Sequence, residues 1–342
     1  MAASMRAQFL RDQRPVALAP LILEEVEPRA PGPGELRLRV EACAVCRTDL
    51  QIVEGDLDLH RAPVIPGHQA VGTVEAVGLT VEGWSPGDRA GIGWLAATCG
   101  VCEYCASGRE NLCEAATFTG WDCDGGYAES MTVRAAFALR LSPDIEAAAL
   151  APLLCGGVIG YRSLRVSGVQ PGQRLGLYGF GASASLAIQV AEHQGCEVFV
   201  VTRSPAEQER AMALGAAWTG GLDEPPPKPL HAAVTFAPAG DVVIAALRAL
   251  APGGAVAINA IHLDRIPEFS YDWLWRERSL RSVANYTRED AREFLELART
   301  IPLRTETQLF PLDEANEALQ MLARGELRGT AVLTMDERGV TR

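Results

Sequence analysis

The chain has 342 residues, of which 48% are hydrophobic and 22% are charged, so it is long enough for two domains with separate cores. Its formal net charge of −12 opposes binding to a phosphate backbone, and no run of Lys and Arg interleaved with aromatic residues offsets that charge. The composition therefore argues against a nucleic-acid partner.

The N-terminal sequence MAASMRAQFLRDQ carries charges where a secretory signal needs an apolar core. The longest uncharged run, 175–191, is interrupted by glycine, serine and glutamine, so no membrane span or membrane partner is expected. Nine cysteines in a chain without an export signal favour a reducing compartment, where clustered thiols are more often metal ligands than disulfides. We therefore expect a cytoplasmic protein.

From residue 1 to about 150, short β-rich runs alternate with turns that contain proline and glycine. The runs include ELRLRVEAC and GTVEAVG, and the turns include PGPG and PGD. This pattern predicts a mostly β domain over residues 1–150.

A parallel βαβ pattern begins near residue 172. Strands are predicted at 174–178, 197–201, 231–237, 254–260 and 280–284, and helices at 181–195 and 204–215. Ser204, followed by Pro205 and Glu207, has the residue types of an N-cap, a first helical position and a capping-box partner. Residues 151–286 are therefore expected to form a second, α/β domain with a doubly wound parallel sheet.

The end of the chain, 287–342, is expected to return to the first domain. Two helices are predicted, beginning near Thr287 and Asp313, and the run AVLTM at 331–335 is predicted to form the closing strand.

Four cysteines lie close together in TCGVCEYCASGRENLC. Their spacing, C-x2-C-x2-C-x7-C, predicts a closed tetrahedral zinc site, because four thiolates fill every coordination position. Such a site stabilises a loop and leaves no position for a substrate. The predicted ligands of this structural zinc are Cys99, Cys102, Cys105 and Cys113.

The motif GFGASA stands between a predicted strand and a predicted helix. Gly179 and Gly181 match the first two glycines of a dinucleotide-binding turn, and Ala184 takes the third position, where a small residue permits close helix packing. The cofactor pyrophosphate is expected at the start of that helix, beside Ala182 and Ser183.

The residues expected at the cofactor ribose leave the choice of cofactor open. An acidic residue is usual at the end of the second strand, but this chain has Thr202, Arg203 and Ser204 there. A cation beside two hydroxyls suits a 2′-phosphate, which favours NADP(H) slightly over NAD(H), although a solvated surface residue is nearly as good an interpretation of Arg203. Ala260, at the end of a later strand, is also assigned to the cofactor site.

Three more residues of metal-ligand type are Cys46, His68 and Cys155. Each has a plain structural interpretation: Cys155 lies in an apolar run that suits a core cysteine, and His68 suits a turn. Cys43 and Cys46 also form a C-x2-C pair, but the helix start expected for a redox pair is lacking. Taken together, Cys46, His68 and Cys155 are a set that would leave one zinc position open.

In chain order, Cys46-Arg47-Thr48-Asp49, Gly67-His68, the four-cysteine segment, Cys155 and GFGASA resemble the zinc-dependent alcohol dehydrogenases of the medium-chain dehydrogenase/reductase superfamily. The resemblance spans nearly the whole chain. It implies a GroES-like catalytic domain over 1–150 and 287–342, a Rossmann domain over 151–286, and one catalytic and one structural zinc. The chain is also similar to a bacterial branch of this family that carries GHQ, here 67–69, and SVANxTR, here 282–288.

The resemblance implies that Cys46, His68 and Cys155 hold the catalytic zinc, which polarises an alcohol or carbonyl oxygen for hydride exchange with nicotinamide. Thr48 would take the alcohol proton, and Asp49 would orient the histidine ligand.

Further positions follow from the same resemblance. Arg47 and Arg328 match residues that contact cofactor phosphates, although a plain surface charge is a fair alternative for Arg328. Trp94 stands where relatives place an aromatic wall of the substrate pocket, and Leu57 and Trp121 are weaker candidates, for which core packing is an equal alternative.

Two positions depart from the family pattern. Gln51 stands where many relatives have a histidine that passes the proton to solvent, and a glutamine does not titrate. Gln69 replaces a glutamate near the zinc, which removes one negative charge and should leave the metal a stronger Lewis acid.

The expected function is reversible hydride transfer between a primary alcohol, aliphatic or aromatic, and NAD(P)+, by a homodimer or homotetramer. One alternative is a quinone reductase or polyol dehydrogenase on the same scaffold, against which Cys155 argues. Another is a catalytically silent zinc- and nucleotide-binding redox sensor, against which Thr48 and Asp49 argue.

Overall fold

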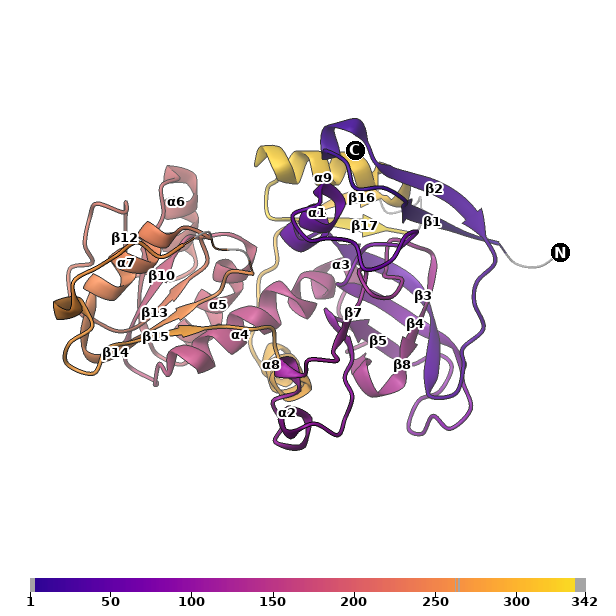
Figure 1. Ribbon diagram of the computed structural model, residues 1–342, viewed down its shortest axis with the longest axis horizontal. Coiled ribbons are helices and arrows are strands. Elements are labelled where there is room, and N and C mark those ends of the chain that lie inside the picture. The colour runs from indigo at the N-terminus through magenta and orange to yellow at the C-terminus, as the bar shows by residue number, and fades with distance from the viewer. Residues whose placement is uncertain (1–3, 262, 264, 336–342) are drawn as a thin grey trace. The chain divides into compact units, whose positions relative to one another are not determined.

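The computed structural model in Figure 1 describes residues 4–261, 263 and 265–335. The chain separates into two compact units. The first unit comprises Met1–Cys155, Thr287–Leu295 and Thr305–Arg342, and the second comprises Gly156–Tyr286 and Glu296–Arg304. Whether these units are domains with the predicted limits depends on their independent folding, so those limits stay a prediction.

The first unit is built on a seven-stranded, mostly antiparallel sheet. Six strands follow the order β16-β17-β3-β4-β5-β9, and β8 also pairs with β3. Two smaller antiparallel pairs, β1-β2 and β6-β7, accompany this sheet. The strands are β1 Met5–Leu10, β2 Leu21–Val26, β3 Glu35–Ala44, β4 Ala70–Val77, β5 Arg89–Ile92, β6 Leu95–Ala97, β7 Thr117–Phe118, β8 Ser130–Arg134, β9 Leu139–Arg140, β16 Thr307–Pro311 and β17 Thr330–Thr334.

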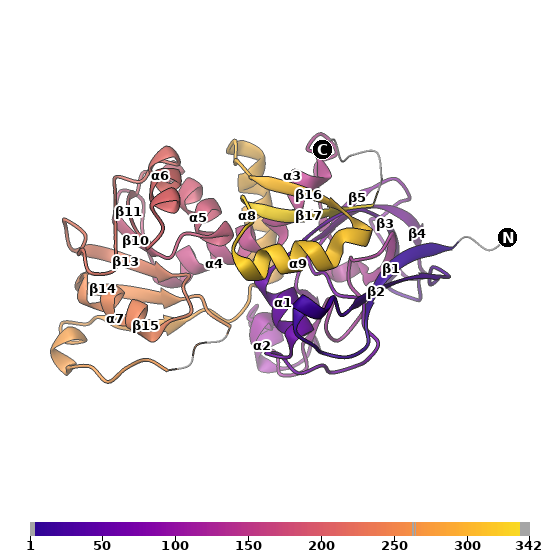
Figure 2. The same ribbon diagram turned by 90° about the horizontal axis from the view of Figure 1, so that it is seen from above.

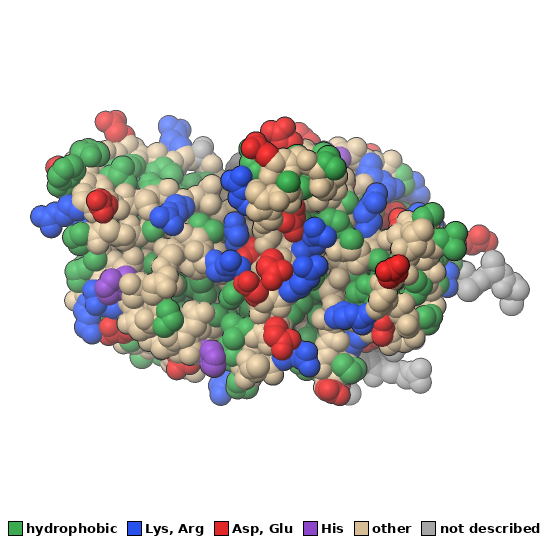
Figure 3. Space-filling model, turned by 90° about the horizontal axis from the view of Figure 1, so that it is seen from below, with side chains coloured by type: hydrophobic (Ala, Val, Ile, Leu, Met, Phe, Trp, Pro, Cys, Tyr) green, Lys and Arg blue, Asp and Glu red, His purple; other side chains and the backbone are tan. Residues whose placement is uncertain are grey.

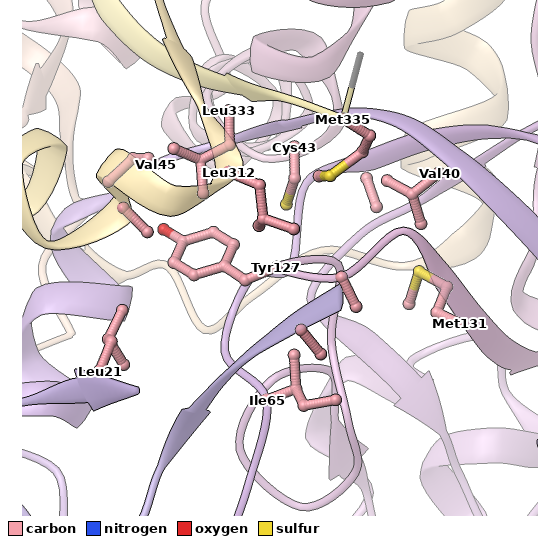
Figure 4. Close-up of a cluster of buried hydrophobic side chains, with 14 of the residues drawn as sticks. Leu21, Val40, Cys43, Val45, Ile65, Tyr127, Met131, Leu312, Leu333 and Met335 are labelled. Carbon is pink, nitrogen blue, oxygen red and sulfur yellow. The ribbon is translucent and has the colours of Figure 1, made fainter. Parts of the chain in front are cut away.

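Strand β3 shows why these residues form a half-buried sheet. Its apolar residues Leu36, Leu38 and Val40 are buried, whereas Arg37 and Arg39 between them are not, as the two-residue period of a strand requires. The buried face packs into one core, and Figure 4 shows Tyr127 in that core between side chains from early and late parts of the chain.

The first unit also contains short helices. They are α1 Arg47–Glu54, α2 Glu103–Ala106, α3 Ala147–Leu150 and α9 Ala315–Arg324, and α8 Arg288–Thr300 begins in this unit. Thr287 caps α8, because its hydroxyl accepts a hydrogen bond from the Asp290 amide at 3.1 Å and its own amide donates to the Asp290 carboxylate at 2.8 Å. The helix predicted near Asp313 begins with a short 3₁₀ turn at Leu312–Glu314 before α9.

The second unit is an all-parallel sheet of six strands in the order β12-β11-β10-β13-β14-β15. Numbered along the chain, this is the 3-2-1-4-5-6 order of dinucleotide-binding folds. Five of the six strands are predicted from the sequence, and the short strand β12 is not. Figures 1 and 2 show α4 and α5 on one side of the sheet and α7 on the other. The elements are α4 Gly156–Ser167, β10 Arg174–Tyr178, α5 Ala182–His193, β11 Glu197–Val201, α6 Pro205–Ala213, β12 Trp218–Gly220, β13 Leu230–Thr235, α7 Gly240–Arg248, β14 Leu250–Ile258 and β15 Ser279–Ser282.

Helix α6 begins where the sequence predicts it, whereas helix α4 is not predicted. The Ser204 hydroxyl accepts a hydrogen bond from the Glu207 amide at 3.4 Å and Pro205 is the first helical residue, whereas the Glu207 carboxylate pairs with Arg210 at 3.2 Å. Helix α4 has no counterpart among the predicted elements, because glycines at 156, 157 and 160 obscure its pattern.

One helical run in the described chain, Ala147–Ser167, is apolar and long enough to cross a membrane, but 61% of its most apolar stretch is buried inside the protein. On the surface that Figure 3 shows, acidic and basic side chains are interspersed. Surface ion pairs such as Arg292–Glu289 at 3.4 Å and Arg299–Glu296 at 3.3 Å have this mixed character.

Candidate functional site

Cys46 lies where strand β3 passes into helix α1. The Val45 amide donates to the carbonyl of Ala331 at 2.8 Å, so strand β17 fixes the chain just before the cysteine. Cys46 is the N-cap of α1, and its amide donates to Asp49 Oδ2 at 2.8 Å. A carboxylate in the first turn of a helix satisfies a free amide and complements the helix dipole.

His68 follows a turn that only glycine fits. Gly67 has a left-handed φ of +97°, and a Cβ placed there would collide with the Tyr127 ring and lie 2.9 Å from Cys43 Sγ. The Gly126 amide donates to the Gly67 carbonyl at 2.8 Å, which holds the turn from the other side. The His68 side chain is therefore fixed in the core, with 1% of its surface exposed.

The structure brings Cys46, His68 and Cys155 together, with one ligand atom from each residue within 4.8 Å of the others. His68 Nδ1 lies 2.9 Å from Asp49 Oδ1, so the ring donates its Nδ1 proton to the carboxylate and leaves Nε2 as the ligand atom. His68 Nε2 is buried and has no hydrogen-bond partner. A buried imidazole nitrogen beside two thiols fits a soft divalent cation such as zinc, with three protein ligands and one position left over.

The charges in this cluster also suit a cation. A hydrogen bond from Cys155 is the main cause that lowers the pKa of Cys46 well below its usual range, and the same contact raises the pKa of Cys155. Burial is the largest single influence on His68 and lowers its pKa, but the Asp49 carboxylate and the negative charge of Cys46 together raise the pKa of His68 to about 10. A divalent cation displaces the remaining protons when it binds to such a set.

The second cluster comprises Cys99, Cys102, Cys105 and Cys113, whose sulfur atoms all lie within 4.8 Å of one another. We call residues 99–113 the cysteine lobe. Cys99 Sγ lies 3.6 Å from Cys113 Sγ and 3.9 Å from Cys105 Sγ, and the Cys102 amide donates to it at 3.3 Å. Hydrogen bonds from the backbone amides of Val101 and Cys102 lower the pKa of Cys99 to about 6, which favours the thiolate that zinc requires. The structure has all nine cysteines as free thiols.

The cysteine lobe is tied to the start of α8. Glu110 is 6% exposed, and its Oε1 accepts from the Arg288 backbone amide at 3.0 Å and from Arg288 Nε at 3.1 Å. These bonds from Arg288 offset the effect of burial and lower the pKa of Glu110. The lobe is therefore anchored to the segment in which the chain re-enters the first unit.

The other predicted residues of the first unit vary in their distance from the cluster. Thr48 is buried, and its hydroxyl lies 3.9 Å from Cys46 Sγ. Gln69 is also buried, 3% exposed, and Gln51 is partly buried on α1. The guanidinium-bearing residues predicted at the cofactor phosphates, Arg47 at the start of α1 and Arg328 before β17, are both exposed.

Trp94 lies against the cluster, with its ring centroid 4.9 Å from that of His68. Trp121 stacks on Trp94 at 5.8 Å. Leu57, the third predicted pocket residue, packs against the core of the first unit. Phe118, in the two-residue strand β7, and His60, in a loop, complete this group of rings, and no periodic pattern in the sequence indicates either residue.

In the second unit, the predicted cofactor loop lies at the point where the strand order reverses, between β10 and β13. Gly179 has a φ of +87°, and a Cβ there would lie 2.9 Å from the Ala237 amide nitrogen, which follows β13. Gly181 is the N-cap of α5 and faces open space, so a ligand can approach its backbone. Ala184, in the first turn of α5, is fully buried.

The remaining predicted cofactor residues lie near the same edge of the sheet. Ala182 and Ser183 form the first turn of α5, Thr202 to Ser204 follow β11, and Ala260 follows β14. Arg203 and Ser204 are exposed, and the Thr202 amide donates to the Gly220 carbonyl at 2.9 Å. Parallel strands with their carboxyl ends at one edge therefore present these residues of the second unit there.

A β-rich unit with a buried thiolate and imidazole cluster and a six-stranded parallel sheet with a glycine-rich turn together define the class of medium-chain dehydrogenases. Two family models match the chain: "Alcohol dehydrogenase GroES-like domain" over residues 32–143 and "Zinc-binding dehydrogenase" over residues 184–300. The chain belongs to the zinc-dependent alcohol dehydrogenase family, whose members are oxidoreductases, and the predicted fold class of a GroES-like domain and a Rossmann domain is confirmed.

Named relatives agree with this assignment. "Probable alcohol dehydrogenase AdhA" of Mycobacterium tuberculosis is 49% identical over 337 residues, which is 97% of both chains. An alcohol dehydrogenase of Geobacillus stearothermophilus is 33% identical over 326 residues, 93% of this chain and 96% of that one. The cobalt- and zinc-bound thermostable alcohol dehydrogenase of Pyrobaculum aerophilum superposes with a TM-score of 0.87 at 25% identity, covering 97% of this chain and all of that one. Membership of the GHQ branch stays a prediction.

Proposed function

We propose that this protein is a zinc-dependent alcohol dehydrogenase and aldehyde reductase that exchanges hydride between a primary alcohol, aliphatic or aromatic, and NAD(P)+. Cys46, His68 and Cys155 hold the catalytic zinc and the cysteine lobe holds a structural one. The observation that carries the proposal is the buried, unpartnered Nε2 of His68 beside two thiols, with Nδ1 committed to Asp49. The family assignment supports the same activity.

A zinc ion bound at the three residues supplies a Lewis acid that stabilises charge on a substrate oxygen. Asp49 keeps the His68 ring in the tautomer that has a free Nε2, and it also fixes the backbone of Cys46. Thr48, buried two residues after the ligand cysteine, holds a hydroxyl that takes the alcohol proton. Gln51, which does not titrate, cannot pass that proton onward as an acid, so the proton leaves by another group or by water.

The nicotinamide cofactor is assigned to the second unit. The open backbone at Gly181 and the start of α5 suit a pyrophosphate. An exposed Arg203 beside the hydroxyls of Thr202 and Ser204 suits a 2′-phosphate, so we propose NADP(H) as the preferred cofactor. Free thiols throughout the chain suit a cytoplasmic enzyme, and we expect a homodimer or homotetramer.

The first experiment is to count zinc by elemental analysis in protein purified without chelators, and then to follow NADPH oxidation with a panel of aldehydes. Two zinc ions per chain, one of which is lost in Cys155→Ala, together with aldehyde-dependent oxidation, are expected. The control is Cys196→Ala, which removes a buried cysteine outside both clusters. A single zinc that survives Cys155→Ala, with no turnover, would favour the silent binding protein instead.

Cofactor preference has its own test. Arg203→Asp places a negative charge where a 2′-phosphate is proposed, so the ratio of kcat/KM for NADPH to that for NADH should fall by roughly tenfold or more, because a charge-assisted hydrogen bond is lost and repulsion is added. Arg174→Asp is unsuitable as a control, since Arg174 Nε donates to the Pro229 carbonyl at 2.6 Å. Arg299→Asp, at an exposed helical position, is the matched control. An unchanged ratio in Arg203→Asp would remove the reason for preferring NADP(H).

A further inference from the structure

Three large aromatic side chains lie against one another beside His68. We call Trp94, Phe118 and Trp121 the aromatic wall. The Trp94 ring is 5.0 Å from Phe118 and 5.8 Å from Trp121, and Phe118 is 5.9 Å from Trp121, all with interplanar angles of 28° or less. The inner end of the wall is the edge contact between Trp94 and His68 at 4.9 Å.

The outer end of the wall is covered by a histidine. The His60 ring stacks on Trp121 with centroids 3.9 Å apart and an interplanar angle of 25°, which is the shortest of these ring contacts. The His60 side chain is 49% exposed, so packing covers only about half of it. Its polar partner supplies the remaining constraint on the stacking geometry.

That partner is Asp122. Its Oδ1 lies 2.6 Å from His60 Nδ1, and its Oδ2 accepts from the Phe118 amide at 2.8 Å. One carboxylate thus connects the histidine to the backbone of the wall. The indole nitrogen of Trp121 donates to the Asp58 carbonyl at 2.8 Å, which fixes the other edge of the same ring.

A second ion pair joins the segment around His60 to the segment around Asp122, and it involves no ring contact. Arg61 Nη1 lies 3.5 Å from Asp124 Oδ1, and the same carboxylate oxygen accepts from the Ile65 amide at 3.1 Å. Loss of the Arg61 pair would loosen the segments in general, whereas loss of His60 would release Trp121 in particular. The two effects can therefore be separated by mutation.

We infer that His60, held by Asp122, is a positioning residue that keeps Trp121 stacked, so that the aromatic wall offers a flat apolar surface beside the metal-site histidine and favours substrates with an aryl group. This inference rests on the proposed function. A flat substrate gains contact from a rigid wall, since the indole has already lost its rotational freedom before binding. A small aliphatic substrate gains little, because it covers less of the wall.

The first test needs no turnover. Acrylamide quenching of tryptophan emission is measured for the zinc-loaded protein and for His60→Ala, each also in a Trp121→Phe background. Removal of His60 should raise the quenching constant by about half or more, and the increase should vanish without Trp121. His60→Phe, which keeps a ring but not the bond to Asp122, should be intermediate. No change in His60→Ala would mean that Trp121 is held without His60 and would overturn the inference.

The second test measures kcat/KM for benzaldehyde and for propanal with the preferred cofactor. His60→Ala should lower the benzaldehyde value about five- to tenfold, mainly through KM, and the propanal value less than twofold. Arg61→Ala, the matched control, should change the ratio of the two values by less than twofold. In Trp121→Ala, a further His60→Ala substitution should have no additional effect on that ratio.

The possible results distinguish a failure of this inference from a failure of the proposed function. Equal losses for both aldehydes in His60→Ala, or a ratio that shifts as much in Arg61→Ala, would mean a general structural role and would overturn the inference. If the unmodified protein reduces neither aldehyde, the proposed function fails, and the quenching experiment alone then decides whether His60 positions Trp121.

Discussion

The two thiol clusters of this protein differ in how they are built. Cys46, His68 and Cys155 come from three separate parts of the chain, and strand pairing, a left-handed glycine and a carboxylate place them around the buried His68. The cysteine lobe takes four ligands from one surface segment, with Cys99 exposed and backbone amides as its main partners.

The difference shows what each cluster requires from the rest of the fold. A lobe with ligands close in sequence can be ordered by the metal itself, since little chain has to be fixed before binding. A cluster with ligands far apart in sequence has its geometry set by the protein, and it can then keep one metal position free of protein atoms. Metal removal should therefore affect stability at one cluster and chemistry at the other.

The largest effect is expected at the cluster of Cys46, His68 and Cys155, which we call the core cluster. His68→Ala removes one of three ligands, so kcat should fall by about a thousandfold or more and one zinc should be lost, while the cysteine lobe keeps its metal. Elemental analysis and aldehyde reduction measure both. Retention of two zinc ions with normal turnover would show that the catalytic metal is not at this cluster.

Asp49→Asn should have the next largest effect. The amide cannot accept both the Cys46 amide proton and the His68 ring proton, so zinc affinity at the core cluster should fall by about ten- to a hundredfold. Competition with a chromophoric chelator measures this affinity. Asp290→Asn is the matched control, because Asp290 accepts the Thr287 amide at the start of α8 as Asp49 accepts the Cys46 amide, but it does not belong to the core cluster. Equal zinc loss in the two variants would contradict a specific role for Asp49.

At the cysteine lobe, Cys102→Ser should act on stability. Loss of a structural metal typically costs about 4 kcal/mol, which corresponds to a fall in Tm on the order of 10 °C, whereas aldehyde reduction at 25 °C should stay within a fewfold of the unmodified protein. Thermal unfolding and initial rates measure the two. A large loss of turnover with an unchanged Tm would mean that the cysteine lobe contributes to the chemistry rather than to stability.

The smallest effect concerns thiol chemistry in the metal-free protein. With a pKa of about 6, Cys99 is about 90% deprotonated at pH 7, whereas the raised pKa of Cys155 keeps that thiol protonated. Iodoacetamide at pH 7 should therefore modify Cys99 at least tenfold faster than Cys155, as peptide mass spectrometry measures, and zinc should protect Cys99. Faster modification of Cys155 would mean that the core cluster opens when the metal leaves.

Much of this architecture could be predicted from the sequence because its signals are local. The strand at 174–178, the turn at Gly179 and the cap at Ser204 each depend on neighbouring residues, and the structure has them within one or two positions. The four-cysteine spacing is equally local. Cys46, His68 and Cys155 are separate in sequence, so they were connected by resemblance to a family rather than by spacing.

Other features could not be read from the sequence because they are contacts between distant loops. His60 and Trp121 are 61 residues apart, and no periodic pattern links them. The bond between Asp49 and the Cys46 amide has no signal in the sequence, because cysteine is not among the residue types preferred at an N-cap. Helix α4 was hidden by its glycines, which pack closely against α5: a Cβ at Gly160 would lie 3.0 Å from the Ser183 carbonyl oxygen.

The pairing of β17 with β3 bears on how the protein is made. Val332 lies opposite Ala44, and the Ala331 carbonyl accepts from the Val45 amide, directly before Cys46. A ribosome synthesises β17 more than 280 residues after Cys46, so the strand that leads to Cys46 stays without this neighbour throughout that interval. The cysteine lobe, whose ligands are all complete by residue 113, has no such delay. The two clusters are thus completed at different moments of translation, the lobe earlier and the core cluster only after Cys155 and β17 have been synthesised.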